Sequence, residues 1–236
     1  MNDTHEHIVK QYDSELHRLT GEIMRMGELA ISQLGDAMDV LQRRDSTAAK
    51  RVIANDSTID ALEHEVSHDV IRLLALRQPM ARDLREVLAA LRIASDIERI
   101  GDYASNAAKR SLALNESPAI AMVPGLNALA RMATDMLREV LAAYRDRDET
   151  RAMIVRARDA ELDALYTGLF RELLTYMAED PRSISSAIHV MFIAKNLERV
   201  GDHATNIAES IWFIVHGTPL LDEREKRDFT TAPIRA

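Results

Sequence analysis

Apolar residues recur along this chain at alternating spacings of three and four, which is the period of an amphipathic helix. The runs are separated by short polar, Asp-containing or Pro-containing breaks, which are typical of helix ends. The pattern therefore predicts an all-α protein with six long helices. Their expected extents are 8–43, 45–76, a third from Pro79, a fourth ending near Tyr144, a fifth from Asp148, and a sixth from Asp180 and Pro181 to Gly217.

The third and sixth predicted helices are apolar on two sides, so we expect each to lie centrally among its neighbours. In the third helix, an apolar stripe leads directly to Glu98, and the next position on it is Gly101. The sixth helix repeats this order with Glu198 and Gly201. A carboxylate on such a stripe needs a positive partner or a bound cation, because an unpaired buried charge is very costly.

Fragments of the sequence repeat in order, which indicates an internal duplication. Residues 93–108 match residues 193–208, and residues 55–62 match residues 158–165. We therefore expect two tandem, sequence-related three-helix bundles. The predicted units are a first repeat at 1–115, a second repeat at 122–218 and a charged C-terminal tail at 219–236.

Each repeat holds D-x-x-x-D on its second helix and E-x-x-x-D on its third, and a spacing of four places both acids on one helix face. With 38 acidic residues in 236 positions, about six such pairs arise by chance, so a single pair carries no weight. The repetition and the apolar stripes distinguish these pairs. Oxygen donors suit hard cations such as Mg, Ca, Mn or Fe. The candidate ligands are Asp56, Asp60, Glu98 and Asp102 in the first repeat, and Asp159, Asp163, Glu198 and Asp202 in the second. The open alternative is that Arg99 and Arg199 neutralise the acids in ordinary salt bridges.

The stretch from His64 to His68 matches H-E-x-x-H, the helix motif of zinc peptidases. Both histidines are expected to face solvent, and the matching stretch 167–171 has no histidine, so a zinc peptidase is disfavoured. A di-metal carboxylate oxidase or iron-handling bundle is kept as an alternative function, although neither Glu98 nor Glu198 is followed by the histidine that such a site uses. His203 is expected at the surface.

The composition excludes several functional classes of protein. The formal net charge of −8 argues against a nucleic-acid binder, which normally shows a basic surface. The absence of cysteine excludes a disulfide scaffold and thiolate chemistry. The N-terminus has no basic and apolar signal pattern, and no apolar run reaches the roughly 18 residues that span a bilayer. We expect a cytoplasmic protein.

The two blocks at 96–102 and 196–202, D-I-E-R-I-G-D and N-L-E-R-V-G-D, resemble the PhoU family of phosphate-transport regulators. Pro79 followed by Asp-Leu-Arg at 83–85 fits the same pattern, and so does Met-Gly at 26–27. The resemblance runs from about residue 12 to residue 217. In the second repeat, Ile-Ser replaces the Leu-Arg pair.

The resemblance implies multinuclear metal sites at these motifs, holding Fe, Mn, Mg or Zn. It also implies a regulator, not an enzyme, that links the phosphate ABC transporter's ATPase subunit to a membrane sensor histidine kinase and represses the phosphate-starvation response. A homodimer that reaches the membrane only through its partners is expected. The side chains expected around the ligands are Arg99, Asn106, Arg199 and Asn206.

Overall fold

The computed structural model describes residues 2–117 and 124–221, and the side chains of residues 14–117 and 125–221. Within these ranges the protein is all-helical, which confirms the predicted class. Most of the predicted tail, 219–236, lies outside them. The elements are α1 (Asn2–Arg43), α2 (Ser46–Arg77), α3 (Arg82–Asn115), α4 (Pro124–Asp146), α5 (Glu149–Glu179), the 3₁₀ turn η1 (Pro181–Ser183) and α6 (Ile184–His216).

The duplication extends to the backbone of the helix junctions. Asp45 accepts two backbone hydrogen bonds of 2.9 Å at the start of α2, and Asp148 accepts one of 2.9 Å at the start of α5. The residues before these caps, Arg44 and Arg147, have the same left-handed conformation, with φ of 53° and 54°. Asp45 and Asp148 are therefore the N-caps of α2 and α5, at the two helix starts expected from the sequence, and each satisfies amide groups that the helix leaves open.

The starts of α3 and α6 differ from the prediction. Gln78 is left-handed, with φ 46°, and Pro79 lies in the loop, so α3 begins only at Arg82. A proline disfavours helical conformation in the residue before it, which explains the extra loop residues. Pro181 opens the short 3₁₀ turn instead of α6 itself, because Asp180 caps that turn at Arg182 N.

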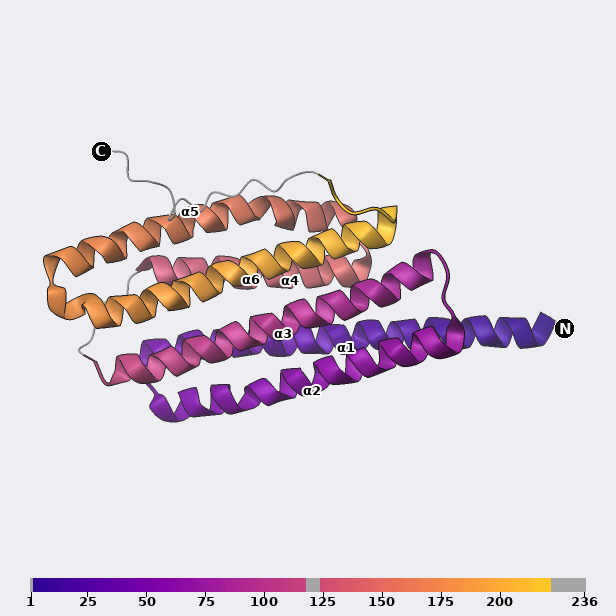
Figure 1. Ribbon diagram of the computed structural model, residues 1–236, viewed down its shortest axis with the longest axis horizontal. Helices are drawn as coiled ribbons and strands as arrows, with labels where there is room; N and C mark the ends of the chain where they lie inside the picture. The colour runs from indigo at the N-terminus through magenta and orange to yellow at the C-terminus, as the bar shows by residue number, and fades with distance from the viewer. Residues whose placement is uncertain (1, 118–123, 222–236) are drawn as a thin grey trace.

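The six helices form two layers of antiparallel rods (Figure 1). Helix α2 packs on α1 and α3, and α5 packs on α4 and α6. The two repeats meet mainly through α3 and α6, which run side by side in opposite directions, and through α1 and α4. No helix in the described ranges has a stretch that is long and apolar enough to cross a membrane.

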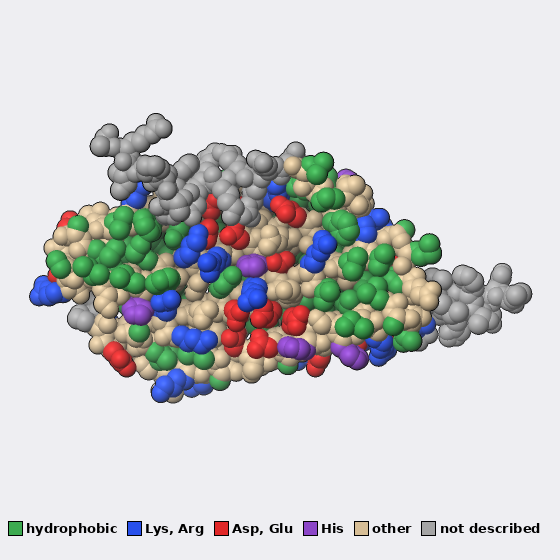
Figure 2. All heavy atoms as spheres, viewed as in Figure 1, with side chains coloured by type: hydrophobic (Ala, Val, Ile, Leu, Met, Phe, Trp, Pro, Cys, Tyr) green, Lys and Arg blue, Asp and Glu red, His purple; other side chains and the backbone are tan. Residues whose placement is uncertain are grey.

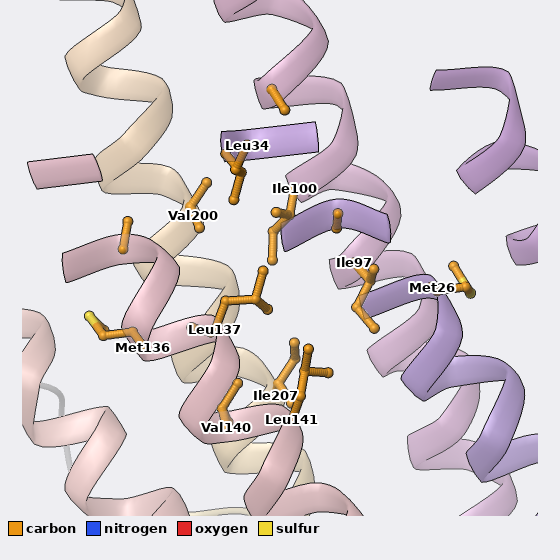
Figure 3. Packing of buried hydrophobic residues seen from close by; sticks show 14 of the residues in the cluster. Met26, Leu34, Ile97, Ile100, Met136, Leu137, Val140, Leu141, Val200 and Ile207 are labelled. Atoms are coloured by element: carbon orange, nitrogen blue, oxygen red, sulfur yellow. The ribbon is translucent and has the colours of Figure 1, made fainter. Parts of the chain in front are cut away.

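The buried apolar residues of both repeats form one continuous core. Figure 3 shows Leu34 of α1, Ile100 of α3, Leu137 of α4 and Val200 of α6 converging where the repeats meet. The four residues are 3 %, 0 %, 0 % and 0 % exposed. The repeats therefore share a core, and each fixes the position of the other's central helix.

Candidate metal-binding carboxylate sites

The second repeat buries three of its four candidate carboxylates between α5 and α6. Asp159 and Asp163 are each 1 % exposed and Glu198 is 2 % exposed, whereas Asp202 is half-buried. The helices approach closely at Gly201, where an added Cβ would lie 3.4 Å from Asp159 Oδ1. The glycine therefore brings α6 close to the aspartates of α5.

A lysine, not an arginine, pairs with Glu198. Lys195 Nζ lies 2.9 Å from Glu198 Oε2 and 5.0 Å from the centre of the Tyr166 ring. Arg199, which the sequence offered as the neutralising group, lies over the Tyr103 ring instead, at 5.8 Å. Burial raises the pKa of the Glu198 carboxyl above its usual value, while its bond to Lys195 acts in the opposite direction.

The first repeat holds the equivalent four carboxylates in a more open setting. Asp56, Asp60, Glu98 and Asp102 are all half-buried. Figure 2 shows acidic side chains gathered near the middle of this face. Burial raises the pKa of the Asp60 and Glu98 carboxyl groups, and the nearby Asp102 carboxylate adds to both shifts. The four groups on α2 and α3 thus interact electrostatically, as four acids brought to one place must.

In the first repeat, Arg99 forms salt bridges with the candidate acids, as the alternative to metal binding predicts. Its Nη1 donates to Asp102 Oδ2 at 3.3 Å, and its Nε lies 3.7 Å from Glu98 Oε2. The arginine is exposed, so the pair contributes little stability. The two repeats therefore compensate equivalent acids differently, with an exposed arginine in one and a partly buried lysine in the other.

Gln33 contacts the first site and was not predicted from the sequence. Its Nε2 donates to Asp56 Oδ1 at 3.1 Å and to the Gly101 carbonyl oxygen at 3.5 Å. The equivalent residue of α4, by the offset of Asp45 and Asp148, is the fully buried Met136. A glutamine on the apolar face of α1 was the available signal, because a buried amide requires a partner.

A polar chain crosses the interface between the repeats next to both sites. His203 Nδ1 donates to Asp96 Oδ1 at 2.7 Å, and the Tyr103 hydroxyl lies 3.2 Å from His203 Nε2. The surface position expected for His203 is wrong, because its side chain is only 19 % exposed. Asn206 also donates to Asp96, at 3.2 Å, and both Asn206 and Asn106 are exposed.

The candidate ligands have the right donor atoms for a metal ion, but their side chains are not arranged around one. Among residues 14–117 and 125–221, no three or more His, Asp or Glu side chains form a group that could hold a metal ion as they stand. The donors are nonetheless all oxygen atoms, and in the second repeat three of the four carboxylates are removed from water. That donor set suits a hard cation, which would require the carboxylates to rotate toward one another.

Taken together, the fold and the sites define a duplicated helical bundle with one cluster of carboxylates in each repeat. The family model for the PhoU domain matches residues 23–111 and 126–211, so the chain belongs to the PhoU family.

Relatives and solved structures agree with this assignment. A phosphate-specific transport system accessory protein PhoU homolog from Xylella fastidiosa is 59 % identical over 95 % of both chains, and one from Caulobacter vibrioides is 47 % identical over 94 % of this chain and 97 % of its own. The crystal structure of PhoU from Pseudomonas aeruginosa superposes with a TM-score of 0.82 at 36 % identity, covering 88 % of this chain and all of that one. The structure from Streptococcus pneumoniae gives 0.83 at 28 % identity, covering 89 % and 99 %.

The relatives are named as accessory proteins of phosphate transport, a regulatory and non-enzymatic family. The chain therefore has a role in regulating phosphate transport and is not an enzyme. The family assignment argues against the oxidase alternative. The zinc peptidase is disfavoured as well, because the side chains of His64 and His68 are 83 % and 77 % exposed.

Proposed function

We propose that this protein regulates phosphate uptake and represses the phosphate-starvation response as a metal-binding adaptor. In this proposal it acts in the cytoplasm as a homodimer, between the ATPase subunit of the phosphate ABC transporter and a membrane sensor histidine kinase. Family membership supports the phosphate role, and the names of the relatives support a place beside the transport system.

One observation carries the metal part of the proposal, namely the burial of Asp159, Asp163 and Glu198 within one helix interface. Several carboxylates removed from water repel one another unless cations lie among them. Lys195 supplies one positive charge at Glu198. A bound Fe, Mn, Mg or Zn ion would supply the larger charge that such a cluster favours.

A bound ion would also account for how a non-enzymatic helical bundle can act as a regulator. Each candidate site joins the second and third helices of its repeat, and those third helices meet at the centre of the molecule. Metal that binds the folded form alone stabilises it by mass action. Occupancy would therefore hold α2 against α3 and α5 against α6, and so fix the surface presented to partners.

The test combines elemental analysis, thermal unfolding and partner binding. Protein purified without added metal should contain metal in proportion to its candidate sites, and exhaustive chelation should lower the melting temperature and weaken retention of the transporter ATPase. The variant Asp159→Asn with Asp163→Asn should lose metal from the second site. Glu161→Gln, an exposed acid between them on α5, is the matched control. If chelation changes neither stability nor ATPase retention, the adaptor mechanism fails.

A further inference from the structure

The H-E-x-x-H stretch of α2 takes no part in the carboxylate sites, and the protein is not a peptidase, so this motif has no assigned role. His64 and His68 are four residues apart on one helix, so their side chains are neighbours on its surface. They line a surface depression of about 350 Å³ together with Glu65, Asp69 and the α1 residues Arg18 and Glu22. In Figure 2, histidine side chains lie beside the acidic side chains of this face.

The imidazole of His64 is held in the form that a metal ligand requires. Its Nδ1 lies 2.7 Å from the carbonyl oxygen of Asp60. A carbonyl oxygen only accepts hydrogen bonds, so Nδ1 carries the proton, and in the neutral ring the lone pair is on Nε2. Metal-binding histidines are commonly oriented by such a bond from the second ring nitrogen. The bond also reduces the number of ring orientations that binding would have to restrict.

The floor of the depression adds negative charge. Glu22 Oε2 is buried and accepts no hydrogen bond from the described part of the chain. Asp69 is 9 % exposed, and Arg18 pairs with both Asp69 and the other carboxylate oxygen of Glu22. With Glu65 the depression therefore holds three carboxylates and one guanidinium. These carboxylates favour the approach of a cation to the two imidazoles.

We propose that His64 and His68 bind a borderline divalent cation of the class that prefers imidazole, namely Zn²⁺, Ni²⁺ or Cu²⁺. The site is separate from the oxygen-donor sites and selects a different class of metal. Among residues 14–117 and 125–221 no third ligand stands in place, so water would fill the remaining positions and binding would be weaker than in a closed zinc site. The second repeat lacks an equivalent, because Thr167 and Arg171 occupy the matching positions.

The test is a zinc titration of tag-free full-length protein in excess Mg²⁺, which occupies oxygen-donor sites, followed by elemental analysis. Wild-type protein should bind one more equivalent of Zn²⁺ than the variant His64→Ala with His68→Ala. His17→Ala removes an exposed histidine with no second histidine four residues away in the sequence, and this variant should retain the extra equivalent. Circular dichroism of each variant checks folding, and His64→Gln tests the loss of the ligand in a side chain of similar size.

The proposal is overturned if wild type and the double variant bind equal amounts of Zn²⁺, or if the single His17 change removes the extra equivalent. Failure of the histidine site can be distinguished from failure of the carboxylate sites. Metal retained by the double variant but lost from Asp159→Asn with Asp163→Asn belongs to those sites alone.

Discussion

Tyr103 and His203 occupy the same position in the two repeats and contact one another, with 3.2 Å between the tyrosine hydroxyl and His203 Nε2. Each residue follows the last candidate ligand of its repeat, Asp102 or Asp202. The contact therefore lies where the approximate two-fold relation between α3 and α6 brings equivalent positions together. It is also a point at which the repeats are chemically different, since one contributes a phenol and the other an imidazole.

Replacing Tyr103 by phenylalanine should destabilise the protein by about 0.5–1.5 kcal/mol, because His203 Nε2 loses its hydrogen-bond partner while the ring packing is kept. Urea unfolding measures the change. A double-mutant cycle with His203→Gln isolates the pair, and a coupling energy near zero would show that the contact contributes nothing.

Gly201→Ala should destabilise the protein by about 1–3 kcal/mol, because the new methyl group overlaps the fully buried Leu162 side chain. The matched control is Gly168→Ala on α5, where no atom lies within 4 Å of an added Cβ. That helical substitution should stabilise by roughly 0.5–1 kcal/mol. Thermal unfolding of both variants decides the matter, and equal shifts would contradict close packing at Gly201.

Lys195→Ser places in the second repeat the residue found at the equivalent position of the first, Ser95. It removes the cation beside the buried Glu198, so we expect a loss of about 1–3 kcal/mol in metal-free protein. Added Mn²⁺ or Mg²⁺ should raise the melting temperature of the variant more than that of wild type, because the ion supplies the missing charge. An equal rise in melting temperature for both proteins would show that Lys195 and the metal ion do not compensate the same charge.

Tyr144 should make stability fall at high pH. Burial raises the pKa of its hydroxyl to about 12, above the usual 10.0. Between these values the unfolded chain has released a proton that the folded protein retains, so the free energy of unfolding falls by up to about 1.4 kcal/mol per pH unit as pH rises above 10. Urea unfolding at pH 9 to 11 measures the slope, and Tyr144→Phe should flatten it.

The sequence alone was sufficient to predict the helices and the duplication. A helix is encoded locally, because its hydrogen bonds join residues four apart and its buried face repeats every three to four residues. The helix starts at Asp45 and Asp148 were predicted equally well, since a side chain that caps the first turn acts over only three residues. The helix starts after Pro79 and Pro181 were misplaced because both depend on loop geometry.

The tertiary structure decided what surrounds each acid. Periodicity placed Glu98 and Glu198 on apolar stripes, but it could not show that α5 buries Glu198 almost completely while α2 leaves Glu98 half-exposed. It also could not assign Lys195 to Glu198 in place of Arg199, or bring Gln33 to Asp56 across 23 residues. Which cation or amide reaches a carboxylate depends on the relative rotation and separation of packed helices. Those are set by interlocking side chains distant in sequence, and no pattern within one helix contains them.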